Sequence, residues 1–115
     1  VNTSIPVESI SALVEKVAVP VCVTACTADD VVRRQIAAGA SIVNVAAGSR
    51  TPQVVEALRW EYPDLPIIAT GGPTDDAIRA TIAAGADAVS WTPPAIADLE
   101  REVMEKARRL AAELL

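Results

Sequence analysis

The best candidates for binding chemistry in this chain are small polar and glycine residues at the ends of its apolar runs. Gly71 and Gly72 follow the run that ends at Thr70 and precede an expected helix. Backbone N–H groups at a helix start bind anions, because the helix dipole favours negative charge there. Arg50 follows another apolar run and can grip a carboxylate or phosphate with two hydrogen bonds. The candidate ligand-binding residues are Asn44, Arg50, Thr70, Gly71, Gly72 and Thr74.

The other reactive side chains narrow the chemistry. The chain has no histidine, which excludes a Ser-His-Asp relay, a Cys-His pair and a His-ligated zinc site. Cys22 and Cys26 lie on one expected strand about 13 Å apart, too far for a disulfide between them. We expect free thiols in a reducing compartment. No catalytic residue is assigned, and no cofactor is expected.

Four carboxylates open two of the expected helices. Two interpretations apply to them. Acids in a first helical turn are favoured by the dipole, which makes them structural. Turned inward, the same carboxylates would hold a divalent metal through oxygen. Nothing in their spacing requires the inward orientation, so no metal site is predicted at Asp29, Asp30, Asp75 and Asp76.

The charge balance and the hydropathy pattern limit the partners. The chain has 15 acidic and 10 basic residues and a formal net charge of −5, which argues against a nucleic-acid surface. No apolar run approaches the length of a membrane span, and no leader opens the chain. These features predict a cytoplasmic protein. Val1 in place of a methionine suggests a processed chain or a fragment.

The chain repeats itself at an offset of 46 residues. Residues 20–45 align with residues 66–91 without a gap, and 11 of the 26 positions are identical, among them Asp29/Asp75 and Gly39/Gly85. A repeat of this length indicates an architecture built from copies of one supersecondary unit. We predict a single domain with a leading helix in residues 1–19, a first βαβα repeat in residues 20–65 and a second in residues 66–115.

Apolar periodicity and turn residues place the elements. Helices are expected over residues 7–17, from the cap at Thr27 to Gly39, from Thr51 and Pro52 to about residue 62, over residues 74–84 and over residues 96–115. Strands are expected over residues 19–25, 41–46, 65–70 and 87–91. Apolar strands separated by single helices must be parallel, with right-handed crossovers.

This α(βα)4 order fits either half of an eight-stranded barrel or a small flavodoxin-like open sheet. One strand face ends in small polar groups at equivalent positions of the repeat, whereas the opposite face is uniformly aliphatic. An open sheet would bury the polar face under helices, where its groups would need partners. A barrel would turn the same face inward and use its upper layer as a ligand site. We therefore favour the half-barrel. The polar positions are Thr24, Asn44, Thr70 and Ser90.

Residues 67–72, with the sequence IIATGG, and the later segment AAGADAV resemble strands seven and eight of phosphate-binding TIM barrels. The nearest likeness is to the class of keto-deoxy-phosphogluconate aldolase, and it runs from about Pro20 onward. The resemblance implies that the glycine pair offers N–H groups to a phosphate. It also places Asn44 where those aldolases carry the Schiff-base lysine, while Lys16 and Lys106 lie on expected helices. Imine chemistry is therefore not expected.

Two functions follow from this pattern. In the first, the chain is a half-barrel scaffold or fragment without catalysis of its own that retains a weak anion site. In the second, it is the C-terminal half of a lyase-like or hydrolase-like enzyme acting on a phosphorylated or carboxylated metabolite. In both cases the unpaired strand edges predict a homodimer or association with another half-barrel. After the fourth strand, Pro93 and Pro94 offer no N–H, so half of the phosphate cradle is expected to be missing.

Overall fold

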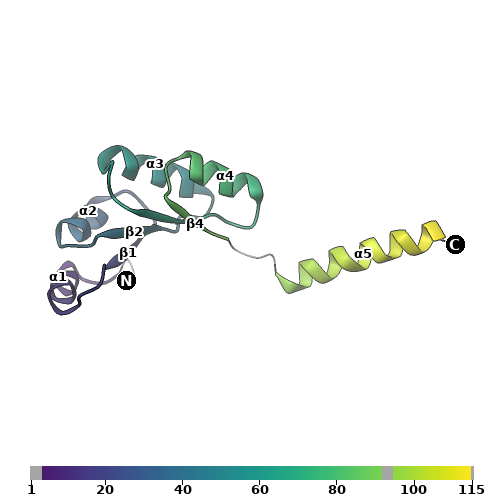
Figure 1. Ribbon diagram of the computed structural model, residues 1–115, viewed down its shortest axis with the longest axis horizontal. Helices are drawn as coiled ribbons and strands as arrows, with labels where there is room; N and C mark the ends of the chain where they lie inside the picture. Colours follow the sequence, from purple (N-terminus) through teal and green to yellow (C-terminus); the bar gives the residue numbers. More distant parts are fainter. Residues whose placement is uncertain (1–3, 92–94, 115) are drawn as a thin grey trace.

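Helices and strands alternate along the whole chain, in the order that the repeat predicts. The computed structural model describes residues 4–91 and 95–114. The elements are α1 (Val7–Lys16), β1 (Cys22–Ala25), α2 (Asp30–Ala37), β2 (Ile42–Val45), the 3-10 turn η1 (Gly48–Arg50), α3 (Thr51–Glu61), β3 (Ile67–Thr70), α4 (Asp75–Ala83), β4 (Ala88–Ser90) and α5 (Ile96–Leu114). Figure 1 shows the strands and the first four helices packed together, with α5 extending away.

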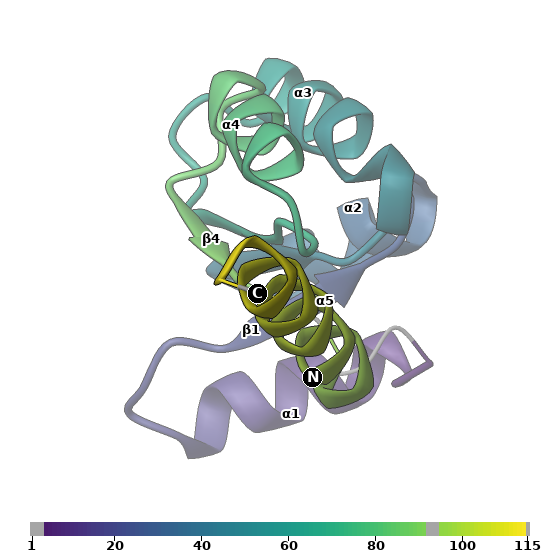
Figure 2. The same ribbon diagram turned by 90° about the vertical axis from the view of Figure 1, so that its right-hand side faces the viewer.

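The four strands form one parallel sheet in the order β1-β2-β3-β4. A flavodoxin-like sheet would place the first strand inside the sheet, in the order 2-1-3-4. The sequential order excludes that alternative and confirms the α(βα)4 arrangement. Seen along the strands, α4, α3, α2 and α1 follow one another in an arc around the sheet (Figure 2).

The two faces of the sheet differ in cover. The face toward the helices is aliphatic and buried, with Val23, Val43 and Ile67 all 0% exposed. Its residues form the core together with Ile10 of α1 and Leu58 of α3. Residues of the opposite face are half-buried in β1 to β3 and exposed at Ala88 and Ser90 of β4. The helices therefore cover one face, as they do in a barrel.

The strand register contains a step between the two repeats. Thr24 pairs laterally with Asn44, and Asn44 pairs with Ile68. In the repeat, however, Thr24 corresponds to Thr70, two residues beyond Ile68. The second repeat is therefore displaced by two residues along the strand direction. Four such repeats would accumulate a shear of eight residues, the value of the eight-stranded βα barrel.

Two predicted helix caps are wrong in detail. Asp29, and not Thr27, caps α2, because its carboxylate accepts hydrogen bonds from two N–H groups of the first turn. Thr51 lies inside α3 and does not cap it. Its hydroxyl oxygen accepts a hydrogen bond from the Ala47 N–H at 3.1 Å, which ties η1 to the helix. The shorter strands have a simple cause at two ends, since Pro20 and Pro66 cannot donate to a ladder.

The glycines that end two matching helices have the predicted left-handed backbone. Gly39 and Gly85 have φ values of 110° and 108°. The N–H of Gly39 donates to Ile36 O, and the N–H of Gly85 donates to Ile82 O, both at 3.0 Å. These bonds close the helix ends, so the repeat is reproduced at the level of single hydrogen bonds.

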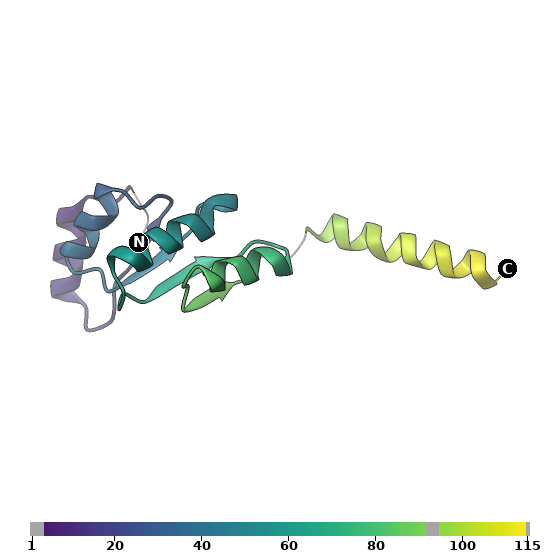
Figure 3. The ribbon, with the colours of Figure 1, turned by 90° about the horizontal axis from the view of Figure 1, so that it is seen from above.

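Helix α5 lies apart from the rest of the structure. It has no buried residue, and the molecule is 68 Å long but only 27 Å by 22 Å across. Figure 3, seen from above, shows the helix continuing beyond the carboxyl ends of the strands. Within the described residues, no helix combines the length and apolar character needed to span a lipid bilayer.

Candidate functional site

The polar residues predicted to line the site lie on one face of the sheet but at two levels. Thr24 pairs with Asn44, and Thr70 pairs with Ser90 further toward the carboxyl ends. The two-residue step in the register separates the two pairs. Asn44 and Thr70 are both half-buried, and they lie on the face opposite the aliphatic core. The upper pair therefore lies at the rim of the open face, with the lower pair beneath it.

Gly71 is fixed by packing against β4. A Cβ atom at this position would lie 2.2 Å from Val89 Cγ1, closer than real Cβ atoms approach. The N–H of Gly71 also donates to the carbonyl of Ser90 at 3.0 Å. Its amide is therefore already used, and the expected anion donors reduce to residues further along the turn.

Gly72 and Thr74 form the turn that leads into α4. Gly72 has φ 76°, which favours glycine, and its nearest contact for a Cβ is at 3.7 Å. The Thr74 oxygen accepts a hydrogen bond from the Ala77 N–H at 3.2 Å and caps the helix. No hydrogen bond within the described residues uses the N–H groups of Gly72, Thr74, Asp75 and Asp76. These four amides remain available at a helix start.

Arg50 lies at the end of the turn η1, directly after β2. Its side chain is exposed and forms no ion pair with the described residues. Because β2 and β3 are neighbours in a parallel sheet, the loops that follow them leave from the same edge. The structure therefore places Arg50 and the Gly72 turn on the same side of the sheet, where the carboxyl ends of the strands lie.

Of the carboxylates at the helix starts, Asp29 caps its helix. The Thr27 hydroxyl donates to Asp29 Oδ2 at 2.6 Å, and the N–H groups of Val31 and Val32 donate to Oδ1 at 3.0 and 3.2 Å. The Thr27 bond first, and then the two backbone bonds, lower the pKa of Asp29 below its usual value. In residues 4–91 and 95–114 no cluster of three or more His, Cys, Asp or Glu could hold a metal ion.

Other carboxylates tie helices together on the outer side. Arg33 of α2 donates from Nε to both oxygens of Glu61 at the end of α3, at 2.8 and 3.0 Å. This hydrogen bond lowers the pKa of Glu61 and raises that of Arg33. Arg59 donates to Asp87 Oδ2 at 2.7 Å, and the Ile67 N–H donates to the same oxygen at 2.8 Å. Bonding from the Ile67 amide first, and then from Arg59, lowers the pKa of Asp87.

Gln35 is a buried polar residue that the sequence interpretation missed. Its side chain is 0% exposed, and its amide nitrogen and oxygen have no hydrogen-bond partner among residues 4–91 and 95–114. The repeat counterpart Thr81 is equally buried, but its hydroxyl donates to Ala77 O at 2.8 Å. The sequence signal was a glutamine three residues after Val32 in the apolar stripe of α2. A hollow of about 240 Å³ adjoins it, lined by Cys26, Thr27, Asp29, Val31, Val32 and Gln35.

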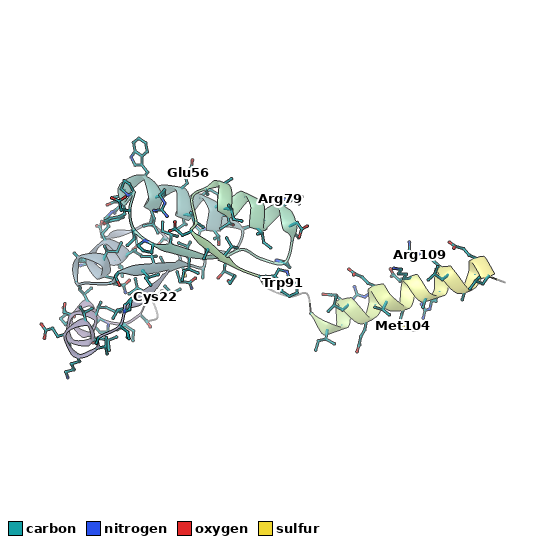
Figure 4. All side chains as sticks on the ribbon, viewed as in Figure 1. Cys22, Glu56, Arg79, Trp91, Met104 and Arg109 are labelled. Atoms are coloured by element: carbon teal, nitrogen blue, oxygen red, sulfur yellow. The ribbon has the colours of Figure 1, made fainter. Side chains whose placement is uncertain are left out.

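The remaining predicted features fall partly outside the described residues. Lys16 and Lys106 lie on α1 and α5, as expected, and neither belongs to a strand end. After Ser90, the last residue of β4, the described part of the loop is Trp91, which is 61% exposed (Figure 4). Residues 92–94 lie outside the described residues, so the missing half of the phosphate cradle stays a prediction. The sequence matches no protein-family model, and no curated protein matches it either.

Proposed function

We propose that this chain is one half of a (βα)8-type barrel that binds a small anion at its strand ends and has no catalysis of its own. The observation that supports this is the open face of the sheet. Asn44 and Thr70 lie half-buried on the face opposite the aliphatic core, and the Gly72 turn follows the carboxyl end of β3. In a closed barrel such a face becomes the interior, and its upper level becomes the ligand site.

The ligand we propose is a phosphate or carboxylate group. The N–H groups of the turn and Arg50 have no partner among the described residues, and together with the positive end of α4 they favour negative charge. Asp75 and Asp76 in the same helical turn oppose it. We therefore expect weak, millimolar binding by the isolated chain, about −4 kcal/mol.

A second half would complete the ring of strand ends. The outer edges of β1 and β4 are unpaired within the sheet, and exposed edges recruit further strands. A second copy of the chain and a different half-barrel are both candidates for the missing four strands. Completion would also exclude water from the polar face, which strengthens each contact to a bound anion.

The alternative is that the chain belongs to a lyase-like or hydrolase-like enzyme acting on a phosphorylated or carboxylated metabolite. The resemblance of residues 67–72 to phosphate-binding barrels favours it. Against imine chemistry stands Asn44 at the position of the lysine, because an amide cannot form a Schiff base. Catalytic groups would then have to come from the other half.

Titration of the 115-residue chain with inorganic phosphate, followed by amide NMR, tests the anion site. We expect saturable shifts at Gly72, Thr74 and Asp75 with a millimolar midpoint, weakened in Arg50→Ala. Arg108→Ala removes a cation from α5 and is the matched control, which should bind as the parent does. Absence of saturable shifts at these amides at tens of millimolar phosphate would remove the site and leave a scaffold.

A further inference from the structure

Helix α5 carries an apolar stripe that no described residue covers. Ile96, Leu99 and Val103 are spaced by three and four residues, so they lie on one side of the helix, and they are 75%, 43% and 66% exposed. Figure 4 shows Met104 and Arg109 pointing to different sides of α5. The helix is therefore amphipathic, and its apolar side is unused.

The stripe has the same spacing as a stripe that α3 buries. Thr51, Val54 and Leu58 of α3 are also spaced by three and four residues, and they are 1%, 8% and 0% exposed. In the order of elements, α3 follows β2 as α5 follows β4. Helix α5 therefore has the surface of a helix that covers strands.

At two matched positions the second repeat exposes more apolar surface than the first. Val43 of β2 is 0% exposed, whereas its counterpart Val89 of β4 is only half-buried. Ile36 of α2 packs against the core, whereas its counterpart Ile82 of α4 is 55% exposed. The apolar surface missing a cover thus lies on α4 and β4, next to the free edge of the sheet.

At the opposite edge of the sheet, β1 is already covered by α1. Helix α1 lies beyond β1 at the end of the arc in Figure 2, with Ile10 buried in the core. Its Val14 side chain lies 3.0 Å from where a Cβ of Gly39 would be. Since α1 precedes the first strand and α5 follows the last, the described residues contribute four strands and five α-helices.

A βα barrel has one helix for each groove between neighbouring strands, eight of each. Two copies of this chain would supply eight strands but ten helices, and at each junction α1 of one copy would compete with α5 of the other. A half with four strands and three helices leaves one helix for every groove. The helix count therefore favours a partner with three helices over a second copy of this chain.

We infer that the partner of this surface is a half-barrel that begins and ends with a strand, four parallel strands joined by three helices. Its first strand pairs with β4 beneath the stripe of α5, and its last strand pairs with β1 beneath α1. The inference rests on the proposed half-barrel but not on the anion site. The partner closes the ring of strand ends around Asn44 and Thr70.

A partner half-barrel of this composition can be made from part of the chain itself. Residues 20–90 span β1 to β4 with the three helices between them, so residues 20–90 joined ahead of residues 1–115 give eight strands and eight helices in one polypeptide. We expect this fusion to be monomeric in sedimentation equilibrium and to unfold in one transition, at a higher denaturant concentration than the 115-residue chain. Amide exchange in β1 and β4 of residues 1–115 should slow at least tenfold.

A matched pair of variants tests whether the apolar stripe of α5 packs on the completed sheet. Val103→Glu places a carboxylate in the stripe, and Ala112→Glu places one nine residues further, on the opposite side of the helix. In the fusion, Val103→Glu should lower the unfolding midpoint and speed amide exchange in β4, whereas Ala112→Glu should change neither. In the 115-residue chain both variants should unfold as the parent does, because α5 is uncovered there.

Four outcomes would overturn the inference. A dimeric 115-residue chain with slowly exchanging β1 and β4 amides would make a second copy the partner. A lower midpoint of Val103→Glu in the 115-residue chain would mean that α5 packs on its own sheet. An unfolded fusion, or a tandem of two complete chains as stable as the fusion, would remove the argument from helix count. Phosphate shifts are measured on the 115-residue chain alone, so the anion site stands or falls independently.

Discussion

Gly71 illustrates how one residue can be required by packing before any ligand is considered. The 2.2 Å approach that a Cβ would make to Val89 leaves no room for a side chain. Its neighbour Gly72 is required for a different reason, its positive φ of 76°. The two glycines of the pair therefore have separable roles.

Gly71→Ala should destabilise the chain more than Gly72→Ala. Overpacking costs about 1–3 kcal/mol, and alanine at a positive φ costs about 1 kcal/mol. Urea unfolding of both variants measures the difference. Equal midpoints would contradict the contact between Gly71 and Val89.

Gln35→Met should stabilise the chain by about 1–3 kcal/mol, because it removes a buried amide that lacks partners and keeps a similar volume. Gln53→Met, at an exposed position of α3, is the control and should have little effect. A loss of stability in Gln35→Met would mean that the amide is satisfied in solution by bound water.

Asp87 should make stability depend on pH. Its folded pKa lies below the unfolded value of about 3.9, so its contribution is present above pH 4 and is lost as the pH falls through the folded pKa. Asp87→Asn should be less stable than the parent at pH 7, by no more than about 1–2 kcal/mol because the side chain is 58% exposed. The difference in unfolding free energy between Asp87→Asn and the parent should decrease below pH 4.

Denaturant midpoints at pH 7, 4 and 3 measure this effect. Asp64→Asn is the control, because that carboxylate has no hydrogen bond or ion pair with the described residues. A gap between Asp87→Asn and the parent that stays constant across the series would argue that the carboxylate acts only through its shape.

At the scale of elements, the helix ends could be predicted because glycine has a distinct backbone preference. The positive φ at Gly39 and Gly85 follows from their place after two apolar stripes. The start of α2 could not be predicted to the residue. Thr27 and Asp29 are both good caps, and the structure uses them together, with the hydroxyl bonded to the carboxylate. Sequence position alone cannot rank two such neighbours.

Gly39→Ala and Gly85→Ala should each destabilise the chain by about 1 kcal/mol or more, because both positions have positive φ and a Cβ would meet a neighbour at 3.0 Å. The neighbour of Gly39 is the stiff Val14, and that of Gly85 is Arg59. Gly48→Asn is the control, since asparagine tolerates φ 60° and the position is open. Thermal unfolding that leaves either alanine variant unchanged would contradict the matched turns.

At the scale of the whole molecule, the sequence was sufficient for the topology but not for the placement of the last helix. The repeat predicts four parallel strands, and the phase of Thr24, Asn44, Thr70 and Ser90 predicts one polar face. The two-residue step between them arises from lateral pairing, which a linear pattern does not contain. Nor could the pattern place α5, because its apolar spacing predicts a buried stripe and the structure leaves α5 without a buried residue.

The hydrogen bond from Gly71 to Ser90 couples the turn before α4 to the edge strand β4. The turn before α4 is held to β4 by this hydrogen bond at 3.0 Å and by the close approach of Gly71 to Val89. Anything that steadies β4 therefore also fixes the turn whose amides we propose as anion donors. Strand addition at the β4 edge and anion capture would then be cooperative, and by linkage each would strengthen the other by the same factor. By this linkage, anion binding would favour association with the partner half-barrel.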